Sequence, residues 1–274
     1  MRVGFIGLGS QGAPMAQRQI ECGVDTLLWA RREATLAPFR DSGAEFADSA
    51  AELARACELV SVCVLDDAGA EDVLCGEQGV LAGIREGQVV ALHSTVHPET
   101  VTMLAAETSK RGATLIDVPV SGGGAAALTG DLVVMVGGER ESFERCQPVF
   151  STYGKPVIHV GPLGTAVVAK LVNNAMMTAQ LGLACDAFAL GEKFGVKHAA
   201  LAEVLTSSSG NSFALGAYAR MGGIEPMKAV AAPLLRKDLG ILAELARERN
   251  ADPGAIVDTA DRALAVLGNP REKR

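Results

Sequence analysis

A lysine and an asparagine stand one helical turn apart in an otherwise apolar stretch of the chain. Every neighbour of Lys170 over residues 166–172 is apolar, and Asn174 follows four residues after the lysine. At this spacing both side chains project from one face of a helix. An ammonium group held there can stabilise negative charge on the oxygen of a reduced carbonyl and deliver a proton to it. The other interpretation is a lysine that extends to the surface beside an asparagine bonded to the backbone.

A glycine-rich turn near the start of the chain predicts the cofactor that such a reaction needs. An apolar strand is expected over residues 2–6 and a helix over 13–20, and the turn between them reads Gly7, Leu8, Gly9, Ser10, Gln11, Gly12. In a dinucleotide fingerprint the first glycine permits the tight turn and the second lets the pyrophosphate approach. The third lets the helix pack closely on the strand, and the start of that helix attracts phosphate. The strand–turn–helix context favours this interpretation over a plain structural loop.

The end of the second predicted strand indicates which dinucleotide is bound. This strand covers residues 26–29 and leads into Arg31 and Arg32, whereas an NAD site normally has a carboxylate about twenty residues beyond the glycines. Two guanidinium groups can instead bind a 2′-phosphate through charge-assisted hydrogen bonds. We therefore expect NADP, with NAD possible. The alternative is that both arginines are solvated loop charges, and Glu33 next to them is expected to weaken the preference.

Alternating strands and helices predict an α/β fold with an N-terminal Rossmann doubly wound sheet followed by an all-helical C-terminal domain. Beyond the first two strands, β-rich runs occur at 59–64, 88–92, 114–118, 132–136 and 156–160, and none follows Gly164. We expect an NADP-binding domain over residues 1–162. A helical substrate and oligomerisation domain is expected over 163–274. It would begin with one long, buried interdomain helix over 163–194.

Loops after the predicted strands supply the remaining candidate site residues, because ligands bind at the carboxyl ends of such strands. We expect Ser121, Gly122 and Gly123 to bind an anionic group, the alternative being a flexible linker. The segments that contain Val64, Leu65 and Thr95 are expected to flank the cofactor.

Three other polar residues near these loops have simpler explanations than catalysis. His93 and His97 lack a spaced carboxylate or ligand partner and are expected to serve turns or packing. Asp117 is expected to be a structural hydrogen-bonding residue.

The composition favours a cytoplasmic enzyme and excludes several other classes. The 274 residues are 49% hydrophobic and 21% charged, which allows a large core. A net charge of −7 argues against a nucleic-acid partner. No apolar run reaches bilayer length, and Met1 leads directly into the first strand, so neither a membrane partner nor a signal peptide is expected. The six cysteines form no CxxC pair and are expected to be reduced, with no metal bound; they are Cys22, Cys57, Cys63, Cys75, Cys146 and Cys185.

Several motifs, spread over almost the whole chain, together resemble the β-hydroxyacid dehydrogenases. They are the turn from Gly7 to Ala16, the segment Asp117–Gly123, the segment Gly161–Gly164, Lys170 with Asn173 and Asn174, and Lys237-Asp238-Leu239. This family includes 3-hydroxyisobutyrate dehydrogenase and the glyoxylate, succinic semialdehyde and tartronate semialdehyde reductases.

The resemblance implies a role for each matching residue. Lys170 matches the catalytic general acid and base, and Asn174 matches the residue that positions the substrate oxygen. Ser121, Gly122 and Gly123 match the loop that binds the substrate carboxylate. Lys237 matches a lysine of the helical domain that lines the same pocket. It is expected to contact the cofactor as well as the substrate. Thr95 matches a threonine beside the cofactor, and Asp238 is expected to orient Lys237 through an ion pair.

We therefore expect an NADP-preferring oxidoreductase that interconverts a small β-hydroxy acid and its semialdehyde or keto acid. Relatives often place an aromatic residue near 229–233, where this chain has only small side chains and one proline, so a wider substrate pocket is expected. Two alternatives remain: an imine reductase of related fold, and a non-catalytic NADP-binding sensor. The apolar helical half predicts a homodimer or homotetramer.

Overall fold

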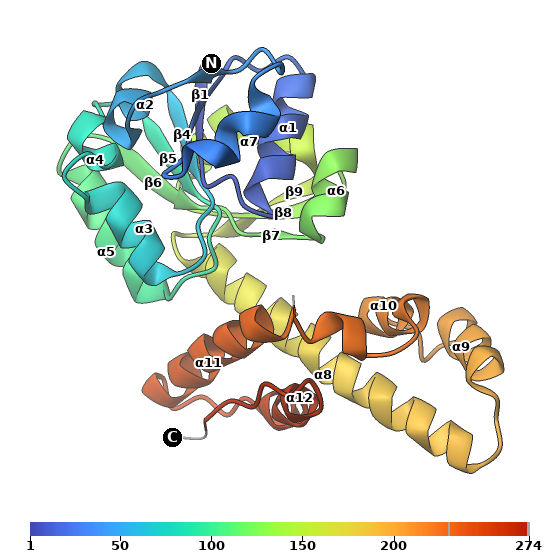
Figure 1. Ribbon diagram of the computed structural model, residues 1–274. Helices are drawn as coiled ribbons and strands as arrows, with labels where there is room; N and C mark the ends of the chain where they lie inside the picture. Colours follow the sequence, from blue (N-terminus) through green and yellow to red (C-terminus); the bar gives the residue numbers. More distant parts are fainter. Residues whose placement is uncertain (230, 273–274) are drawn as a thin grey trace. The chain divides into compact units, whose positions relative to one another are not determined.

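Strands and helices alternate through the first half of the chain. The computed structural model describes residues 1–229 and 231–272, and the chain divides into two compact units, residues 1–170 and 171–274. The first unit holds the sheet, and the second is helical (Figure 1). This agrees with the predicted α/β class and with a Rossmann sheet followed by a helical region.

The sheet has the strand order of a dinucleotide-binding domain. Six strands run parallel in the order β3-β2-β1-β4-β5-β6, after which β8 lies antiparallel to β6, with β7 antiparallel and β9 parallel to β8. The strands are β1 (Val3–Ile6), β2 (Thr26–Trp29), β3 (Glu45–Phe46), β4 (Leu59–Val62), β5 (Val89–Leu92), β6 (Thr114–Asp117), β7 (Val120–Ser121), β8 (Leu132–Gly137) and β9 (Gly154–Gly161). Because the parallel strands point the same way, the loops after them share one edge of the sheet.

Helices cover both faces of this sheet, because successive strand residues point to opposite sides. Phe5 packs in one apolar cluster with Met15 and Phe150, whereas Ile6 packs in the other with Leu53 and Leu104. The first cluster contains residues of α1 (Gly12–Glu21), α6 (Gly123–Thr129), α7 (Arg140–Tyr153) and the 3₁₀ helix η1 (Glu33–Phe39). The second contains residues of α2 (Ala50–Ala56), α3 (Asp67–Cys75), α4 (Val80–Gly83) and α5 (Pro98–Ser109).

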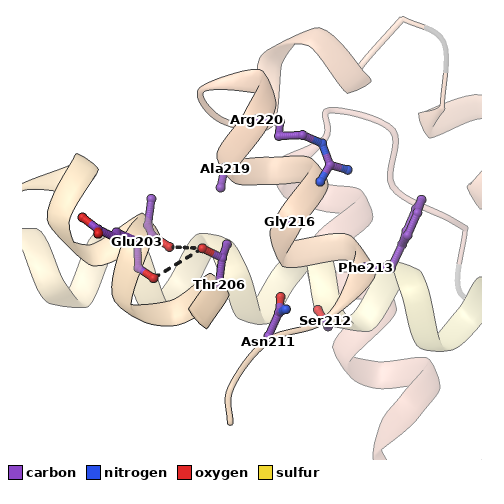
Figure 2. A pocket seen from close by; sticks show the side chains of 9 residues that line it. Glu203, Thr206, Asn211, Ser212, Phe213, Gly216, Ala219 and Arg220 are labelled. Carbon is purple, nitrogen blue, oxygen red and sulfur yellow. Dashed lines mark hydrogen bonds between the residues drawn. The ribbon is translucent and has the colours of Figure 1, made fainter. Parts of the chain in front are cut away.

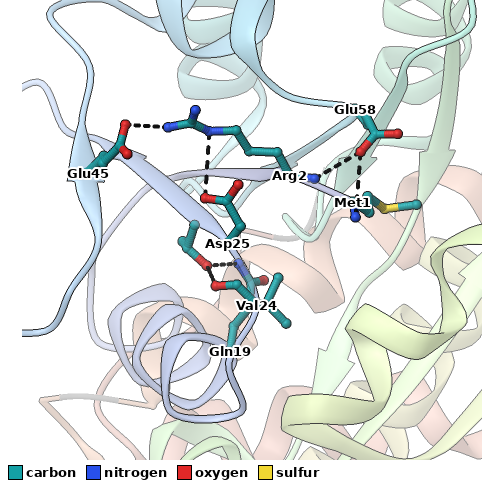
Figure 3. A network of polar contacts seen from close by, with 8 residues as sticks. Met1, Arg2, Gln19, Val24, Asp25, Glu45 and Glu58 are labelled. Carbon is teal, nitrogen blue, oxygen red and sulfur yellow. Dashed lines mark hydrogen bonds and ion pairs between the residues drawn. The ribbon is translucent and has the colours of Figure 1, made fainter.

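A polar network ties the strands together at the edge opposite these loops (Figure 3). Arg2, just before β1, donates from its side chain to Glu45 at 2.5 Å and lies 3.7 Å from Asp25. The backbone N–H of Arg2 donates to Glu58 at 2.9 Å. These carboxylates come from the starts of β2, β3 and β4, so the network holds the amino ends of four strands in register. The charged groups at this edge therefore serve the fold.

The second unit packs helices around an alanine- and leucine-rich core. Its helices are most of α8 (Thr165–Lys193), α9 (His198–Ser207), α10 (Phe213–Met221), the 3₁₀ helix η2 (Glu225–Met227), α11 (Ala232–Glu248) and α12 (Ala255–Val266). The core includes Ala175, Leu235, Leu239 and Leu264, all buried. The N-cap Ser212 accepts a hydrogen bond from the backbone N–H of Leu215 and so fixes the start of α10.

All seven strands predicted from the sequence are present, and α8 spans nearly the predicted 163–194. The sequence pattern missed β3 and β7, because two residues are too few to show an alternating pattern. The expectation that α8 is wholly core is wrong on one face, where Leu183 and Leu190 are 56% and 57% exposed. Within the described residues, no helix is long and apolar enough to cross a bilayer.

All six cysteines carry free thiols. Burial raises the pKa of the Cys57, Cys63 and Cys146 thiols to about 12, so all three stay protonated and unreactive at neutral pH.

Candidate active site

The turn after β1 has the backbone geometry that a dinucleotide fingerprint requires. Gly7 has a φ of +93°, and a side chain there would collide with the backbone carbonyl of Cys63. A side chain at Gly12 would collide with the carbonyl oxygen of Gly7, so only glycine allows α1 to start this close to the strand. Around Gly9, in contrast, no atom lies within 4 Å of the position that a Cβ would occupy. Gly7 and Gly12, at the two ends of the turn, therefore pack against the protein backbone, whereas the space beside Gly9, in the middle, can admit a ligand.

The other residues of this turn contribute backbone or polar groups. Leu8 is only 6% exposed and packs in the core, so its side chain faces away from any ligand. Ser10 is exposed. Gln11 is the N-cap of α1, yet its side chain accepts no capping hydrogen bond from the helix. The first amides of α1 are therefore free of a side-chain cap, which is the condition for binding phosphate at a helix start.

The two arginines after β2 are both exposed, at the same edge of the sheet as the glycine turn. Arg31 lies 3.7 Å from Asp72 of α3, with both side chains mostly in solvent. Such a surface pair is weak. Glu33, expected to oppose an anion here, lies 3.3 Å from Arg40. The charge of Glu33 is therefore partly compensated by a group other than Arg31 and Arg32.

The loops after β4 and β5 are joined to each other. The backbone N–H of Val64 donates to the Ser94 hydroxyl at 2.9 Å, and that of His97 donates to the Asp67 carboxylate at 2.8 Å. Leu65 is 67% exposed. Thr95, half-buried, lies between Ser94 and His97 in the second loop. These bonds join the loops that carry Val64, Leu65 and Thr95 at the carboxyl ends of β4 and β5.

The loop after β7 packs directly against the glycine turn. Ser121 pairs with Val133 in the sheet, and Gly122 and Gly123 adopt φ values of +134° and +76° at the start of α6. A Cβ on the next residue, Gly124, would lie 2.6 Å from the carbonyl oxygen of Ser10. Two glycine-rich segments, more than a hundred residues apart in sequence, therefore meet in the first unit.

His93 and His97 have structural roles. His93 is 3% exposed, and its Nδ1 lies 2.8 Å from the carbonyl oxygen of Val118. Its ring stacks on Phe5 with 6.1 Å between centroids. Burial lowers the pKa of His93 to about 4, so the ring is neutral at physiological pH. His97 is the N-cap of α5 and accepts from the backbone N–H of Glu99 at 3.2 Å.

Asp117, at the end of β6, fixes the start of α8. Its two carboxylate oxygens accept hydrogen bonds from the backbone N–H groups of Gly164 and Val167, each at 2.8 Å. Burial raises the pKa of Asp117, and the hydrogen bonds from the backbone oppose that rise. This is the structural role expected for it. The bonds also hold the first turn of the helix on which Lys170 lies.

Lys170 and Asn174 occupy successive turns of α8, as the spacing predicts. Lys170 is half-buried, and Asn174 is 9% exposed. In the second unit, the Nδ2 of Asn174 donates to the Oδ2 of Asp238 at 2.5 Å. The other oxygen of Asp238 lies 3.1 Å from the Nζ of Lys237, so this carboxylate joins two of the predicted site residues.

Apart from Lys170, which lies at the end of the first unit, the predicted residues thus form two groups, one in each unit. The first group lies at the edge of the sheet where the strands have their carboxyl ends. It consists of the glycine turn, Arg31, Arg32, Val64, Leu65, Thr95 and the Ser121–Gly123 loop. Asn174 and Lys237 are joined through Asp238 in the helical unit. The sequence predicts a role for Asp238 toward Lys237 alone. Its bond to Asn174 had no signal in the sequence, because 64 residues separate the two.

Two hollows lie away from these residues. One, of about 490 Å³, lies between α9 and α10 and is lined by Glu203, Asn211, Phe213 and Arg220 among others (Figure 2). The other, of about 530 Å³, lies beside His159 and Glu139 in the first unit. No residue predicted to bind cofactor or substrate lines either hollow. The segment 229–233, expected to widen the substrate pocket, includes Val230, which lies outside the described residues.

Two family models cover nearly the whole chain. Residues 2–161 match the NAD binding domain of 6-phosphogluconate dehydrogenase, and residues 164–265 match the NAD-binding domain of NADP-dependent 3-hydroxyisobutyrate dehydrogenase. The description of each model names a nicotinamide cofactor, in agreement with the open glycine turn.

Individual relatives extend the match. The chain is 33% identical over 253 residues to 2-(hydroxymethyl)glutarate dehydrogenase of Eubacterium barkeri, covering 91% of this chain and 84% of the relative. The structure of Mycobacterium tuberculosis 3-hydroxyisobutyrate dehydrogenase with L-serine superposes with a TM-score of 0.85, at 25% identity over 97% of this chain and 94% of that one. A structure of Psf3 in complex with NADP+ and 2-OPP gives a TM-score of 0.84, at 29% identity over 97% and 93% of the two chains.

Fold, glycine turn, family models and relatives all agree with the resemblance seen in the motifs. The chain belongs to the β-hydroxyacid dehydrogenase family and is an NAD(P)-dependent oxidoreductase of that family.

Proposed function

We propose that this protein is an NADP-preferring reductase that converts a small semialdehyde or keto acid into the β-hydroxy acid, with Lys170 as the proton donor. The observation that carries the proposal is the contact between the two glycine-rich segments. The open backbone at Gly9 suits a pyrophosphate, and the Ser121–Gly123 loop offers a hydroxyl and backbone N–H groups to a carboxylate. A dinucleotide and a carboxylate-bearing substrate would then bind as neighbours. We also propose the functional domain boundary between residues 162 and 163, where β9 has ended and α8 is about to begin.

The roles of the residues follow from the charges that develop during reduction. The bound nicotinamide cofactor supplies the hydride to the carbonyl carbon. Negative charge then grows on the carbonyl oxygen, where the ammonium group of Lys170 stabilises it and transfers a proton. Asn174, one turn along α8, donates a hydrogen bond to the same oxygen. Ser121, Gly122 and Gly123 hold the substrate carboxylate, and Lys237 adds a positive charge to the pocket.

Preference for NADP is supported by the groups after β2. Arg31 and Arg32 are adjacent and exposed, and Glu33, the acidic residue that follows them in the sequence, is paired with Arg40. A 2′-phosphate bound there gains charge-assisted hydrogen bonds that NAD cannot make. The Arg31–Asp72 pair lies mostly in solvent and is too weak to prevent this.

Steady-state turnover with NADPH and with NADH tests the proposal. The substrates are glyoxylate, succinic semialdehyde, methylmalonate semialdehyde and tartronate semialdehyde. Reduction of at least one of them, with kcat/KM higher for NADPH, is the expected result. Binding of NADPH without turnover of any substrate would contradict the substrate class, and an amine product from an imine would establish the alternative activity.

We also propose that two copies associate through α8. Leu183, Leu190 and Phe194 lie at spacings of seven and four residues, hence on one face, and are 56%, 57% and 77% exposed. Such a stripe is unusual on a monomer surface. Light scattering at micromolar concentration should give the wild type a molar mass of at least a dimer. The Leu190→Glu variant should have the molar mass of a monomer. Ala189→Glu puts the same charge on another exposed side of α8 and should leave the assembly intact. A monomeric wild type would contradict the proposal.

A further inference from the structure

Asp238 lies between two residues of the candidate site and is itself almost inaccessible. It is 3% exposed on α11, with Asn174 bound to one carboxylate oxygen at 2.5 Å and Lys237 at 3.1 Å from the other. A buried carboxylate is costly unless it is paired and hydrogen-bonded, and these two groups provide both. Asp238 is therefore the link between Asn174 on α8 and Lys237 on α11.

The bond to Asp238 decides which way the amide of Asn174 points. An ionised carboxylate only accepts hydrogen bonds, so the amide nitrogen faces Asp238. The amide oxygen of Asn174 is turned the other way and accepts from the Nδ2 of Asn173 at 3.2 Å. The second hydrogen on the amide nitrogen remains, so Asn174 can act as a donor to a ligand. A donor is what a substrate oxygen needs when it gains negative charge.

The same carboxylate balances a positive charge. Lys237, a quarter exposed, is held next to Asp238 along α11. Without the carboxylate, the ammonium of Lys237 would lose this ion pair, and the surroundings of Lys237 would gain one net positive charge. Orientation of Asn174 and placement of Lys237 therefore depend on one side chain.

We propose that Asp238 is a positioning residue of the reaction: it orients Asn174 as a hydrogen-bond donor and anchors Lys237 beside it. This inference rests on the proposed function, because it assigns both partners to the substrate pocket. Asp238 itself does not transfer a proton. It acts through the two residues that it holds.

The isosteric variant Asp238→Asn tests this role against a matched control. Asp261 is another carboxylate of the second unit whose side chain is mostly covered, at 9% exposure, with Arg271 donating to its two oxygens at 3.1 and 2.8 Å. Both substitutions remove one mostly covered ion pair. Asp238→Asn should lower kcat/KM by about 10- to 100-fold, mostly through kcat, because hydrogen bonds to charged groups are the strong ones. Asp261→Asn should leave kcat within about twofold of wild type, even if its Tm falls equally.

A double-mutant cycle separates positioning from an independent effect. If Asp238 acts through Asn174, adding Asp238→Asn to Asn174→Ala should lower kcat by no more than about twofold further. Fully additive losses, or a wild-type kcat in Asp238→Asn, would overturn the inference. So would equal losses of kcat in Asp238→Asn and Asp261→Asn.

A measurement without turnover separates this inference from the proposed function. The short bond to a carboxylate predicts a side-chain amide proton of Asn174 shifted downfield in the NMR spectrum, identified by its loss in Asn174→Ala. That shift should disappear in Asp238→Asn. An unshifted proton in the wild type would overturn the inference even if the enzyme is active, whereas a shifted proton in a protein that reduces no hydroxy-acid precursor would overturn the proposed function alone.

Discussion

Asn174 and Asp238 are 64 residues apart in the sequence, and a hydrogen bond of 2.5 Å joins the Nδ2 of one to the Oδ2 of the other. This bond connects α8, which carries the candidate proton donor, to α11, which carries Lys237. In the helical unit, a buried carboxylate thus contacts polar groups of two helices. In the first unit, close contacts between backbone segments depend instead on glycines, such as Gly124 beside the carbonyl oxygen of Ser10.

The three glycines of the turn after β1 should respond differently to alanine. Gly7→Ala and Gly12→Ala force a side chain against backbone carbonyls, so each should lower the free energy of unfolding by about 2 kcal/mol or more. Gly9→Ala meets open space and should leave Tm unchanged while raising the Kd for NADPH about tenfold or more, because the methyl group occupies the path of the pyrophosphate. Thermal melts and fluorescence titrations of the three variants measure this. Normal NADPH affinity in Gly9→Ala would exclude the turn as the pyrophosphate site.

Arg32→Ala should raise the Kd for NADPH about tenfold or more and leave the Kd for NADH unchanged, because only the 2′-phosphate needs the guanidinium. Asp72→Asn frees Arg31 from its surface pair and should strengthen NADPH binding, by no more than about fivefold since such pairs are weak. Isothermal titration calorimetry of each variant with each cofactor gives the four dissociation constants, which are compared with those of the wild type. A parallel change for NADH and NADPH would show that these residues do not read the 2′-phosphate.

Acid should destabilise the fold partly through His93. Burial lowers the pKa of His93 from 6.5 to about 4. Between these two pH values the His93 ring is protonated in the unfolded chain and neutral in the folded chain. Stability therefore falls as the pH drops from 6.5 to about 4, by about 3 kcal/mol in total from this group, and no further below that. His93→Phe keeps an aromatic ring beside Phe5 and should reduce the loss over this range. Urea unfolding at pH 7 and pH 4.5 compares the two proteins, and an identical pH dependence would rule out His93 as a source.

The sequence predicted the parts of this molecule that depend on local pattern. Strand–turn–helix order located the glycine turn, and the apolar runs located the seven longer strands of the sheet. The four-residue spacing of Lys170 and Asn174 placed both on α8. These features need only neighbouring residues to be recognised.

What the sequence left out depends on long-range contacts. Nothing local distinguishes Gly124, yet it packs against Ser10 and so brings the two glycine-rich segments together. The bond from Asn174 to Asp238 likewise arises only when α8 and α11 pack. The exposed face of α8 was also missed, because a helix that is apolar on most of its surface does not show which side its neighbours will cover.

The most direct test of the central claim is the single-turnover rate of hydride transfer in Lys170→Ala, with NADPH and the best substrate of the wild type. Lys193→Ala, an exposed lysine at the end of the same helix, is the matched control. If Lys170 donates the proton, Lys170→Ala should bind NADPH normally and lose about 100- to 10,000-fold in rate, while Lys193→Ala keeps the wild-type rate. A rate within about threefold of wild type in Lys170→Ala would contradict the account.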